Sequence, residues 1–149
     1  MNLDPNFSEF IALLRAHDAR FLIVGGYAVA FHGHPRYTGD LDVWLLTEAD
    51  NARAVLAALE DFGFGGVGLG AEDFTLPDHV VQLGYPPLRI DLLTSIDGVD
   101  FEDAYARRVE VQVAGTTVPF ISLDDLRRNK EASGRAQDAA DLEALENRR

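Results

Sequence analysis

A pair of glycines, Gly25-Gly26, stands where a strand is expected to give way to a helix. The four apolar residues Phe21–Val24 precede the pair and predict a buried strand, because a short apolar run that ends in glycine usually is one. The stretch Tyr27–His32 predicts a short helix. The free N–H groups and the positive dipole at its start could hold an anion such as phosphate. A glycine pair by itself more often marks only a turn.

Thirteen residues after the glycine pair the sequence reads Asp40-Leu41-Asp42, at the start of an expected strand, Leu41–Leu46. Residues two apart on a strand point to the same face, so both carboxylates are expected to leave one side of the sheet. Two carboxylates aimed the same way repel each other unless a cation lies between them. Ligands that are all oxygens favour Mg²⁺.

A third carboxylate, Asp91, interrupts the run Leu88–Thr94, which predicts a strand that is otherwise apolar at its centre. Burying an unpaired charge is costly, so Asp91 needs a partner. If its strand lies beside Leu41–Leu46, Asp91 joins Asp40 and Asp42. Three acids around one or two Mg²⁺ ions are the apparatus of in-line nucleotidyl transfer, in which Asp91 would be the general base or a second-metal ligand.

Composition favours one soluble domain. A chain of 149 residues can bury roughly 70% of its unfolded surface and hold a core unaided. Cysteine is absent, which excludes disulfides and thiolate metal sites and agrees with a reducing cytoplasm. The start of the chain lacks the pattern of a signal peptide, and its apolar runs are far shorter than the ~20 residues of a membrane span. We therefore expect a cytoplasmic protein with no membrane partner.

The net charge of −12 argues against binding of long nucleic acids, because a polyanion is repelled. A local basic patch could still bind nucleotides. The residues available for such a patch are Arg36, Arg89, Arg107, Arg108, Arg127, Arg128, Lys130 and Arg135, and Lys130 is the single lysine of the chain.

Helices and strands are expected to alternate, with helices at the end. The expected strands are Phe21–Val24, Leu41–Leu46, His79–Gly84, Leu88–Thr94, Val109–Val113 and Thr117–Ile121. The expected helices are Pro5–His17, Tyr27–His32, a helix from a capping box at Thr47 to about Asp61, Asp100–Arg107, and a C-terminal part that starts at a capping box at Ser122 and bends near Gly134. The glycine-rich stretch Phe62–Gly70 predicts a turn or loop. The fold class is α/β (α+β), a single domain over residues 1–149 with a mixed core to about 121 and helices over about 122–149.

Taken together, the glycine pair, the Asp-x-Asp motif and the later aspartate resemble the nucleotidyltransferase superfamily typified by DNA polymerase beta. The resemblance is strongest in three segments: "VGGYAVAFHGHPRYTGDLDVWL", "QLGYPPLRIDLLTSIDGVDFEDA" and "ISLDDLRRNKEASGRAQDAADLEAL". These segments are similar to small bacterial proteins of the nucleotidyltransferase fold, including toxins of two-gene systems. The implied fold is a small mixed sheet flanked by helices, with a helical C-terminal part.

The resemblance also implies roles for particular residues. Gly25 and Gly26 would hold the triphosphate of an NTP substrate, Asp40 and Asp42 would bind metal, and Asp91 would complete the triad. Many members have Gly-Ser where this chain has Gly-Gly, which removes a hydroxyl but keeps the backbone N–H contacts. The toxin-type members carry a Lys and an Asp in their helical part, which Lys130 and either Asp138 or Asp141 could match.

Several of these side chains also have a purely structural interpretation. Arg36 could neutralise triphosphate charge or form a surface salt bridge. Trp44 could stack on a base or pack in the core. Lys130 could touch a phosphate while Asp138 or Asp141 orients it; alternatively, the two acids could pair with Arg135 or Lys130, at only about 0.3–0.5 kcal/mol per exposed helix pair. His32 and His34 could bind phosphate or acceptor, or cap a helix end.

The expected activity is transfer of NMP from an NTP to a hydroxyl or phosphate acceptor, with Mg²⁺ or Mn²⁺ as cofactor. Acidity and small size favour a small molecule, a protein side chain or an RNA end as acceptor. A toxin-like role beside a partner protein from a two-gene system is implied by the resemblance alone. The alternative is a catalytically inactive nucleotide-binding or regulatory module that binds a partner protein.

Overall fold

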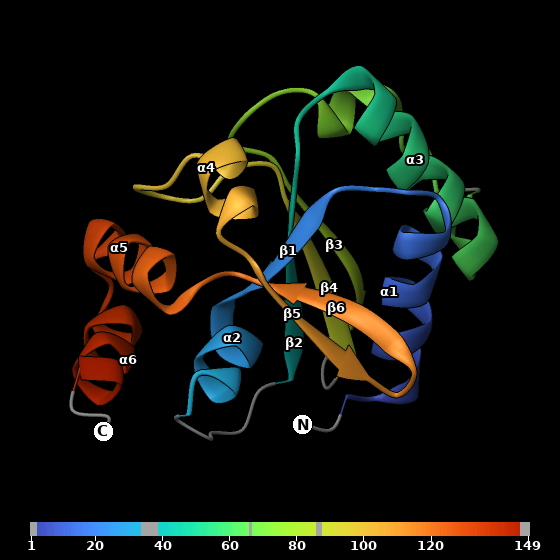
Figure 1. Ribbon diagram of the computed structural model, residues 1–149. Helices are drawn as coiled ribbons and strands as arrows, with labels where there is room; N and C mark the ends of the chain where they lie inside the picture. Colours follow the sequence, from blue (N-terminus) through green and yellow to red (C-terminus); the bar gives the residue numbers. More distant parts are fainter. Residues whose placement is uncertain (1–2, 34–38, 66, 86–87, 147–149) are drawn as a thin grey trace.

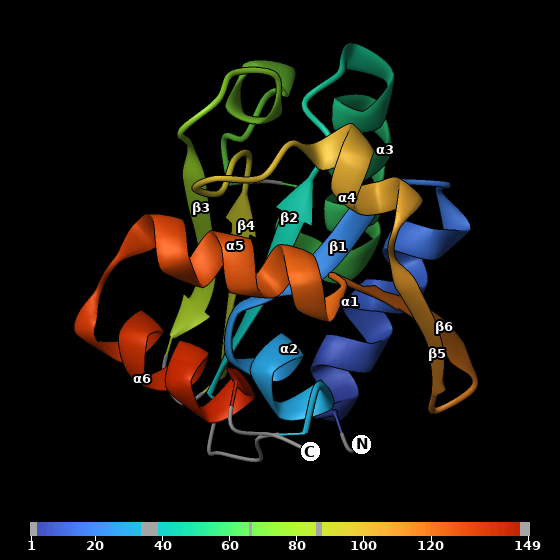
Figure 2. The ribbon, with the colours of Figure 1, turned by 60° about the vertical axis from the view of Figure 1, so that its left-hand side comes forward.

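The computed structural model describes residues 3–33, 39–65, 67–85 and 88–146, which form one six-stranded mixed sheet with helices on both faces (Figure 1, Figure 2). The strands, in chain order, are β1 (Phe21–Val24), β2 (Asp40–Leu45), β3 (Val80–Tyr85), β4 (Leu88–Leu93), β5 (Val109–Val113) and β6 (Thr116–Phe120). The helices are α1 (Pro5–Ala16), α2 (Gly25–Phe31), α3 (Ala49–Leu59), α4 (Phe101–Ala106), α5 (Leu123–Ser133) and α6 (Ala136–Glu146). The fold class expected from the sequence is thereby confirmed.

The strands run in the order β3-β4-β2-β1-β6-β5 across the sheet. Two antiparallel hairpins, β3–β4 and β5–β6, form its two ends. Strand β2 pairs with β1 in antiparallel fashion and with β4 in parallel, and β1 pairs with β6 in parallel. The middle of the sheet is therefore β4-β2-β1, which are the strands that carry the motifs singled out above.

Helices α1 and α3 lie on one face of the sheet, and α2, α5 and α6 lie on the other (Figure 1, Figure 2). An apolar stripe at helical spacing, Phe7, Phe10, Ile11 and Leu14, buries one side of α1 against the sheet. All four residues of β1 are buried, as expected for a strand covered on both faces. Among the described residues, no helix has the length and apolar character that crossing a membrane requires.

Each expected strand is present to within one residue at either end. Ser122 caps α5 through its side chain, as predicted, and Asp4 caps α1 in the same way. The bend near Gly134 is confirmed, since this residue ends α5 in the left-handed conformation with φ of 66°. The two prolines of the expected β3–β4 turn, Pro86 and Pro87, lie outside the described residues.

Three local expectations need correction. Helix α2 begins at Gly25, two residues earlier than predicted. The capping box at Thr47 is wrong, because α3 begins after Glu48, which forms no capping hydrogen bond through its side chain. The predicted loop after Asp61 starts as a π-helical turn, Glu60–Phe64, and a 3₁₀ turn, Ala71–Phe74, follows. Short irregular turns of this kind depend on packing more than on local sequence.

One buried amide fastens the ends of the two central strands. The Asn51 side chain accepts from the backbone N–H of Arg20 at 2.7 Å, and it donates to the carbonyl oxygens of Arg20 at 3.0 Å and Leu46 at 2.9 Å. Arg20 precedes β1 and Leu46 follows β2, so Asn51 ties both strands to α3.

We expect Asn51→Ala to lower the free energy of unfolding by about 2–3 kcal/mol, because it leaves buried backbone groups without partners. Urea unfolding followed by circular dichroism measures the change, with the exposed Asn6→Ala as the control. Equal stability of the two variants would show that water replaces the amide without cost.

Candidate active site

Three carboxylates meet on two adjacent parallel strands. In the register of β2 and β4, Asp42 lies opposite Asp91 and Asp40 lies opposite Arg89. Asp40 and Asp42 share a face of β2 because they are two residues apart, and the same alternation puts Arg89 and Asp91 together on β4. The structure therefore brings Asp40, Asp42 and Asp91 to one face of the sheet, the one that carries α5 and α6.

Arg89 is the cation that lies between these carboxylates. Its Nε and Nη2 atoms donate to the two oxygens of Asp91 at 2.9 and 3.1 Å, and Nη2 also donates to Asp40 Oδ2 at 2.8 Å. In the sequence Arg89 stands out only as one of several basic residues, which does not predict this position. Its two-residue spacing from Asp91 on an expected strand was the signal that could have found it.

The Asp42 carboxyl is held close to its protonated form. Burial, repulsion from Asp91, a hydrogen bond with Asp91 and repulsion from Asp40 raise the pKa of Asp42 to about 7, and attraction by Lys130 opposes them. Arg89 neutralises Asp40 and Asp91 directly, through hydrogen bonds to both carboxylates.

Gly25 is required by the close approach of Asp42. A Cβ atom at Gly25 would lie 2.0 Å from Asp42 Oδ2, and the residue has φ of +67°, a conformation that favours glycine. Gly26 follows as the second residue of α2. Val24 at the N-cap makes no capping hydrogen bond through its side chain, so the start of α2 is uncapped beside Asp42.

A cleft of about 330 Å³, which we call the Asp42 cleft, separates these elements from the C-terminal helices. Gly25 and Asp42 line it from the sheet. Its opposite wall comes from α5, the turn after it and the segment that follows β4, and consists of Ser95, Ile96, Asp97, Asn129, Lys130, Ser133 and Arg135. Sequence regions about 100 residues apart thus face one another across the cleft.

Lys130 sits between two buried acids of α6. Its Nζ donates to Asp138 Oδ1 at 2.8 Å and lies 3.3 Å from Asp141 Oδ2. Burial favours the protonated form of Asp138, but hydrogen bonds from Arg135, Lys130 and Ser133 outweigh it and lower the pKa of this carboxyl below its ordinary range. The expected pairing with Lys130 and Arg135 is present, but it is not exposed, because the side chains of Lys130, Asp138 and Asp141 are at least 95% buried.

Other side chains singled out in the sequence have structural contacts. His32 Nε2 donates to the carbonyl oxygen of Ile121 at 2.7 Å, which ties the end of α2 to the end of β6. Trp44 is buried and packs edge-on against Phe101 of α4, in agreement with the core interpretation. Arg36 and His34 lie outside the described residues.

The three carboxylates are candidate ligands of a divalent metal. Within residues 3–33, 39–65, 67–85 and 88–146, no group of three or more His, Cys, Asp or Glu side chains is arranged to hold a metal ion. Arg89 accounts for this arrangement at the triad, since its guanidinium binds Asp40 and Asp91. The chemistry of the donors nevertheless fits Mg²⁺, because carboxylate oxygens are its preferred protein ligands. The partly exposed Arg89 side chain would have to rotate away from Asp40 and Asp91 before these carboxylates could bind a metal.

The raised pKa of Asp42 predicts a specific dependence of stability on pH. Between about pH 4 and pH 7 the folded protein holds a proton that the unfolded chain has lost, so this group lowers stability as pH rises through that window. Between pH 5 and pH 7.5, the free energy of unfolding of Asp42→Asn is expected to rise by about 1–2 kcal/mol relative to that of the original protein. This figure allows for solvent screening of a partly buried group. Urea unfolding of the metal-free protein at both pH values measures this. If the difference in free energy of unfolding between the two proteins were the same at both pH values, this prediction would be contradicted. The exposed Glu143→Gln is the control.

Residues 4–147 match the family described as nucleotidyltransferase of unknown function (DUF6036). A search of curated proteins finds no significant match. Among solved structures, the fold is similar to TM1012 of Thermotoga maritima, a candidate nucleotidyltransferase, with 15% identity, a TM-score of 0.59, and coverage of 96% of this chain and 91% of that one.

Two further structures share the fold. The lincosamide antibiotic adenylyltransferase LnuA, solved with lincomycin bound, is 14% identical, has a TM-score of 0.58 and is matched over 97% of both chains. An antigenic nucleotidyltransferase-like protein from Paracoccidioides brasiliensis is 19% identical, with a TM-score of 0.51 and coverage of 94% of this chain and 74% of that one. The resemblance stated from the sequence is confirmed: the chain belongs to the DUF6036 nucleotidyltransferase family and has the nucleotidyltransferase fold.

Proposed function

We propose that this enzyme transfers NMP from an NTP to a hydroxyl or phosphate acceptor, with Mg²⁺ or Mn²⁺ held by Asp40, Asp42 and Asp91. The observation that carries the proposal is the register of β2 and β4, which sets Asp42 opposite Asp91 beside a cleft lined by Gly25 and Lys130. When bound, the metal neutralises triphosphate charge and favours ionisation of the attacking hydroxyl.

For a hydroxyl acceptor, the acceptor oxygen forms a bond to the α-phosphorus, and the bond from that phosphorus to the pyrophosphate oxygen breaks. Asp91 takes the hydroxyl proton, and pyrophosphate leaves. Gly25 and Gly26 bring the backbone close to the phosphates because neither carries a side chain, and the α2 start beside them is uncapped. Placement of the triphosphate in the Asp42 cleft agrees with its size of about 330 Å³.

Lys130 is proposed to contact a phosphate from the opposite wall of the Asp42 cleft. Its bonds to Asp138 and Asp141 fix the ammonium in place and reduce the entropy lost on binding. Asp138 and Asp141 would therefore act as positioning residues. Arg135, which also lines the cleft and bonds to Asp138, is a further cation on this wall.

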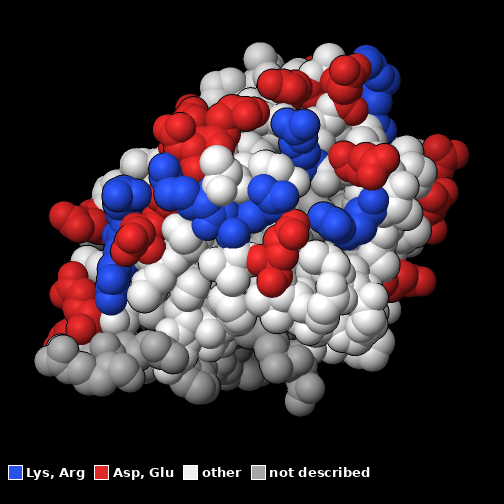
Figure 3. All heavy atoms as spheres, viewed as in Figure 1, with Lys and Arg blue, Asp and Glu red and all other residues white. Residues whose placement is uncertain are grey.

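The acceptor is more compatible with a small molecule than with a long nucleic acid. Lys and Arg side chains form a band on one face of the protein, but Asp and Glu side chains lie beside them (Figure 3). Several basic side chains are also paired with acids: Arg107 and Arg128 bond to Asp125, and Arg108 bonds to Glu110. A toxin-like role, a protein partner and a cytoplasmic location rest on the sequence alone and remain predictions.

We expect Asp42→Asn to lower metal-dependent transfer from labelled ATP, CTP, GTP or UTP into cell extract by at least about 100-fold, because a triad carboxylate is lost. The exposed Glu143→Gln is the matched control and should retain transfer. Calorimetry with the same nucleotides, with and without Mg²⁺, distinguishes the alternatives. Metal-dependent nucleotide binding without any transfer supports the regulatory module. Absence of metal-dependent nucleotide binding contradicts both the transferase and the regulatory module.

Because the Arg89 guanidinium binds two of the proposed metal ligands, Arg89→Gln is expected to tighten Mn²⁺ binding to the nucleotide-free protein by roughly tenfold. Titration calorimetry measures the affinity. Arg108→Gln, which removes a guanidinium paired with Glu110 instead, is the control. An unchanged affinity in Arg89→Gln would show that this side chain does not compete with the metal.

A further inference from the structure

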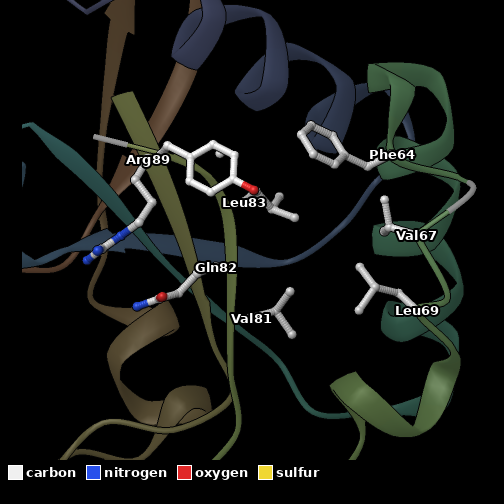
Figure 4. A pocket seen from close by; sticks show the side chains of 9 residues that line it. Phe64, Val67, Leu69, Val81, Gln82, Leu83 and Arg89 are labelled. Carbon is white, nitrogen blue, oxygen red and sulfur yellow. The ribbon is translucent and has the colours of Figure 1, made fainter. Parts of the chain in front are cut away.

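A larger cavity of about 630 Å³, which we call the β3 pocket, lies at the free edge of the sheet (Figure 4). Strand β3 is the terminal strand next to β4, so the pocket is separated from Asp91 by a single strand. The β3 pocket and the Asp42 cleft share no lining residue. The proposed triad is thus flanked by two different cavities.

One wall of the β3 pocket is apolar. Val81 and Leu83 point from β3 toward Phe64, Val67 and Leu69, which come from the segment that follows α3 (Figure 4). Val67 remains 55% exposed although it is aliphatic. An apolar wall left open to solvent at a concave site is typical of a binding site for an organic molecule.

The other side of the β3 pocket leads to the triad. Gln82 and Arg89 point away from the apolar wall, to the opposite side of β3 (Figure 4). Gln82 lies opposite Asp91 in the register of β3 and β4, so the two side chains share a face of the sheet. Arg89 lines the pocket and also donates to Asp91 at 2.9 Å. A molecule in the pocket that reaches Gln82 is therefore one strand away from Asp91.

Gly84 lies on β3 at the rim of the pocket, between its apolar and polar walls, and places no side chain there. It lines the pocket, has φ of +82°, and a Cβ atom there would lie 2.9 Å from the carbonyl oxygen of Leu88. A side chain at this position would be strained by the backbone and would crowd the turn. Gly84 consequently leaves a gap in the row of β3 side chains between the two walls of the pocket.

We propose that the β3 pocket is the acceptor site, and that it takes a small, uncharged or cationic alcohol with a largely apolar body. This inference rests on the proposed function. The apolar body packs on the Val81 and Leu83 wall, and the hydroxyl end crosses the rim toward Gln82 and Asp91. NTP in the Asp42 cleft then meets the acceptor from the other side. The transfer forms a phosphodiester between the alcohol oxygen and the α-phosphorus, releases pyrophosphate, and moves the hydroxyl proton to Asp91.

Charge is the reason for excluding anionic acceptors. The cation of the pocket, Arg89, is already paired with Asp40 and Asp91, and the whole chain carries a net charge of −12. A phosphate on the acceptor would add negative charge beside three carboxylates. A volume of about 630 Å³ suits a molecule of drug size and is too small for a macromolecule.

The competing occupant is a second copy of the chain. Strand β3 is an edge strand, and Val80 and Tyr85 on it are 56% and 86% exposed. Edge strands of this kind can pair with another chain. The experiment therefore includes the oligomeric state.

The test uses 2-(2-naphthyl)ethanol, a neutral alcohol with an apolar body, and its phosphate monoester as the anionic match. Methyl NMR of the full chain without nucleotide reports on Val67, Leu69, Val81 and Leu83. We expect these methyl groups to shift with the alcohol, and at least about tenfold weaker binding of the monoester. Equal or tighter binding of the monoester, or alcohol shifts confined to other methyl groups, would overturn the proposal.

Variants locate the binding. Val67→Asp and Val81→Asp should each weaken alcohol binding at least about tenfold, because they place a charge on the apolar wall. Val67 is exposed, so its variant keeps the test valid if Val81→Asp fails to fold. Val109→Asp, on the opposite edge of the sheet and 38% exposed, is the control and should bind normally. Unchanged binding in Val67→Asp contradicts the proposed site.

Two further readouts separate this proposal from the proposed function. Calorimetry of Val67→Asp with ATP and Mg²⁺ should match the original protein to within about twofold, since the Asp42 cleft is untouched. Alcohol binding without metal-dependent nucleotide binding would overturn nucleotidyl transfer and leave an alcohol-binding pocket. Nucleotide transfer without alcohol binding would refute the pocket alone. Sedimentation that shows a dimer lost in Val67→Asp, with no alcohol bound, would assign the surface to a second copy.

Discussion

The repulsion among three carboxylates on neighbouring strands is the constraint around which this protein is built. Asp42 lies opposite Asp91, and Asp40 lies two residues before Asp42 on the same face of the sheet. Burial of Asp42, together with repulsion from Asp91 and Asp40, raises the pKa of its carboxyl to about 7. The surrounding residues either offset this charge or make room for it.

Different residues compensate for the charge and the bulk of these carboxylates. Arg89 binds Asp40 and Asp91, Lys130 attracts Asp42 from across the cleft, and Gly25 leaves space for the Asp42 oxygen where any Cβ would collide. Lys130 is in turn fixed by Asp138 and Asp141, so α6 influences the sheet through α5. The Asp42 cleft thus lies between the middle of the sheet and a helical wall that supplies Lys130 and Arg135.

Most of the architecture could be predicted because it depends on local patterns. Apolar runs bounded by glycine and proline located the strands to within one residue, and Ser122 and Gly134 marked the limits of α5. The turns at Glu60–Phe64 and Ala71–Phe74 could not be predicted in this way, since irregular turns depend on what packs against them. Burial of Lys130 between two acids was missed for the same reason, because helix periodicity does not reveal what covers a helix face.

The sequence by itself determined which residues can do chemistry: two acids spaced to share a strand face, a third acid within an apolar run, and a glycine pair before a helix. These features depend on side-chain alternation and backbone freedom, which are local properties. Only the tertiary structure decided that Asp91 lies opposite Asp42, that Arg89 joins two of the acids, and that an apolar pocket opens one strand beyond them. Those relations depend on strand order and register, which long-range packing selects.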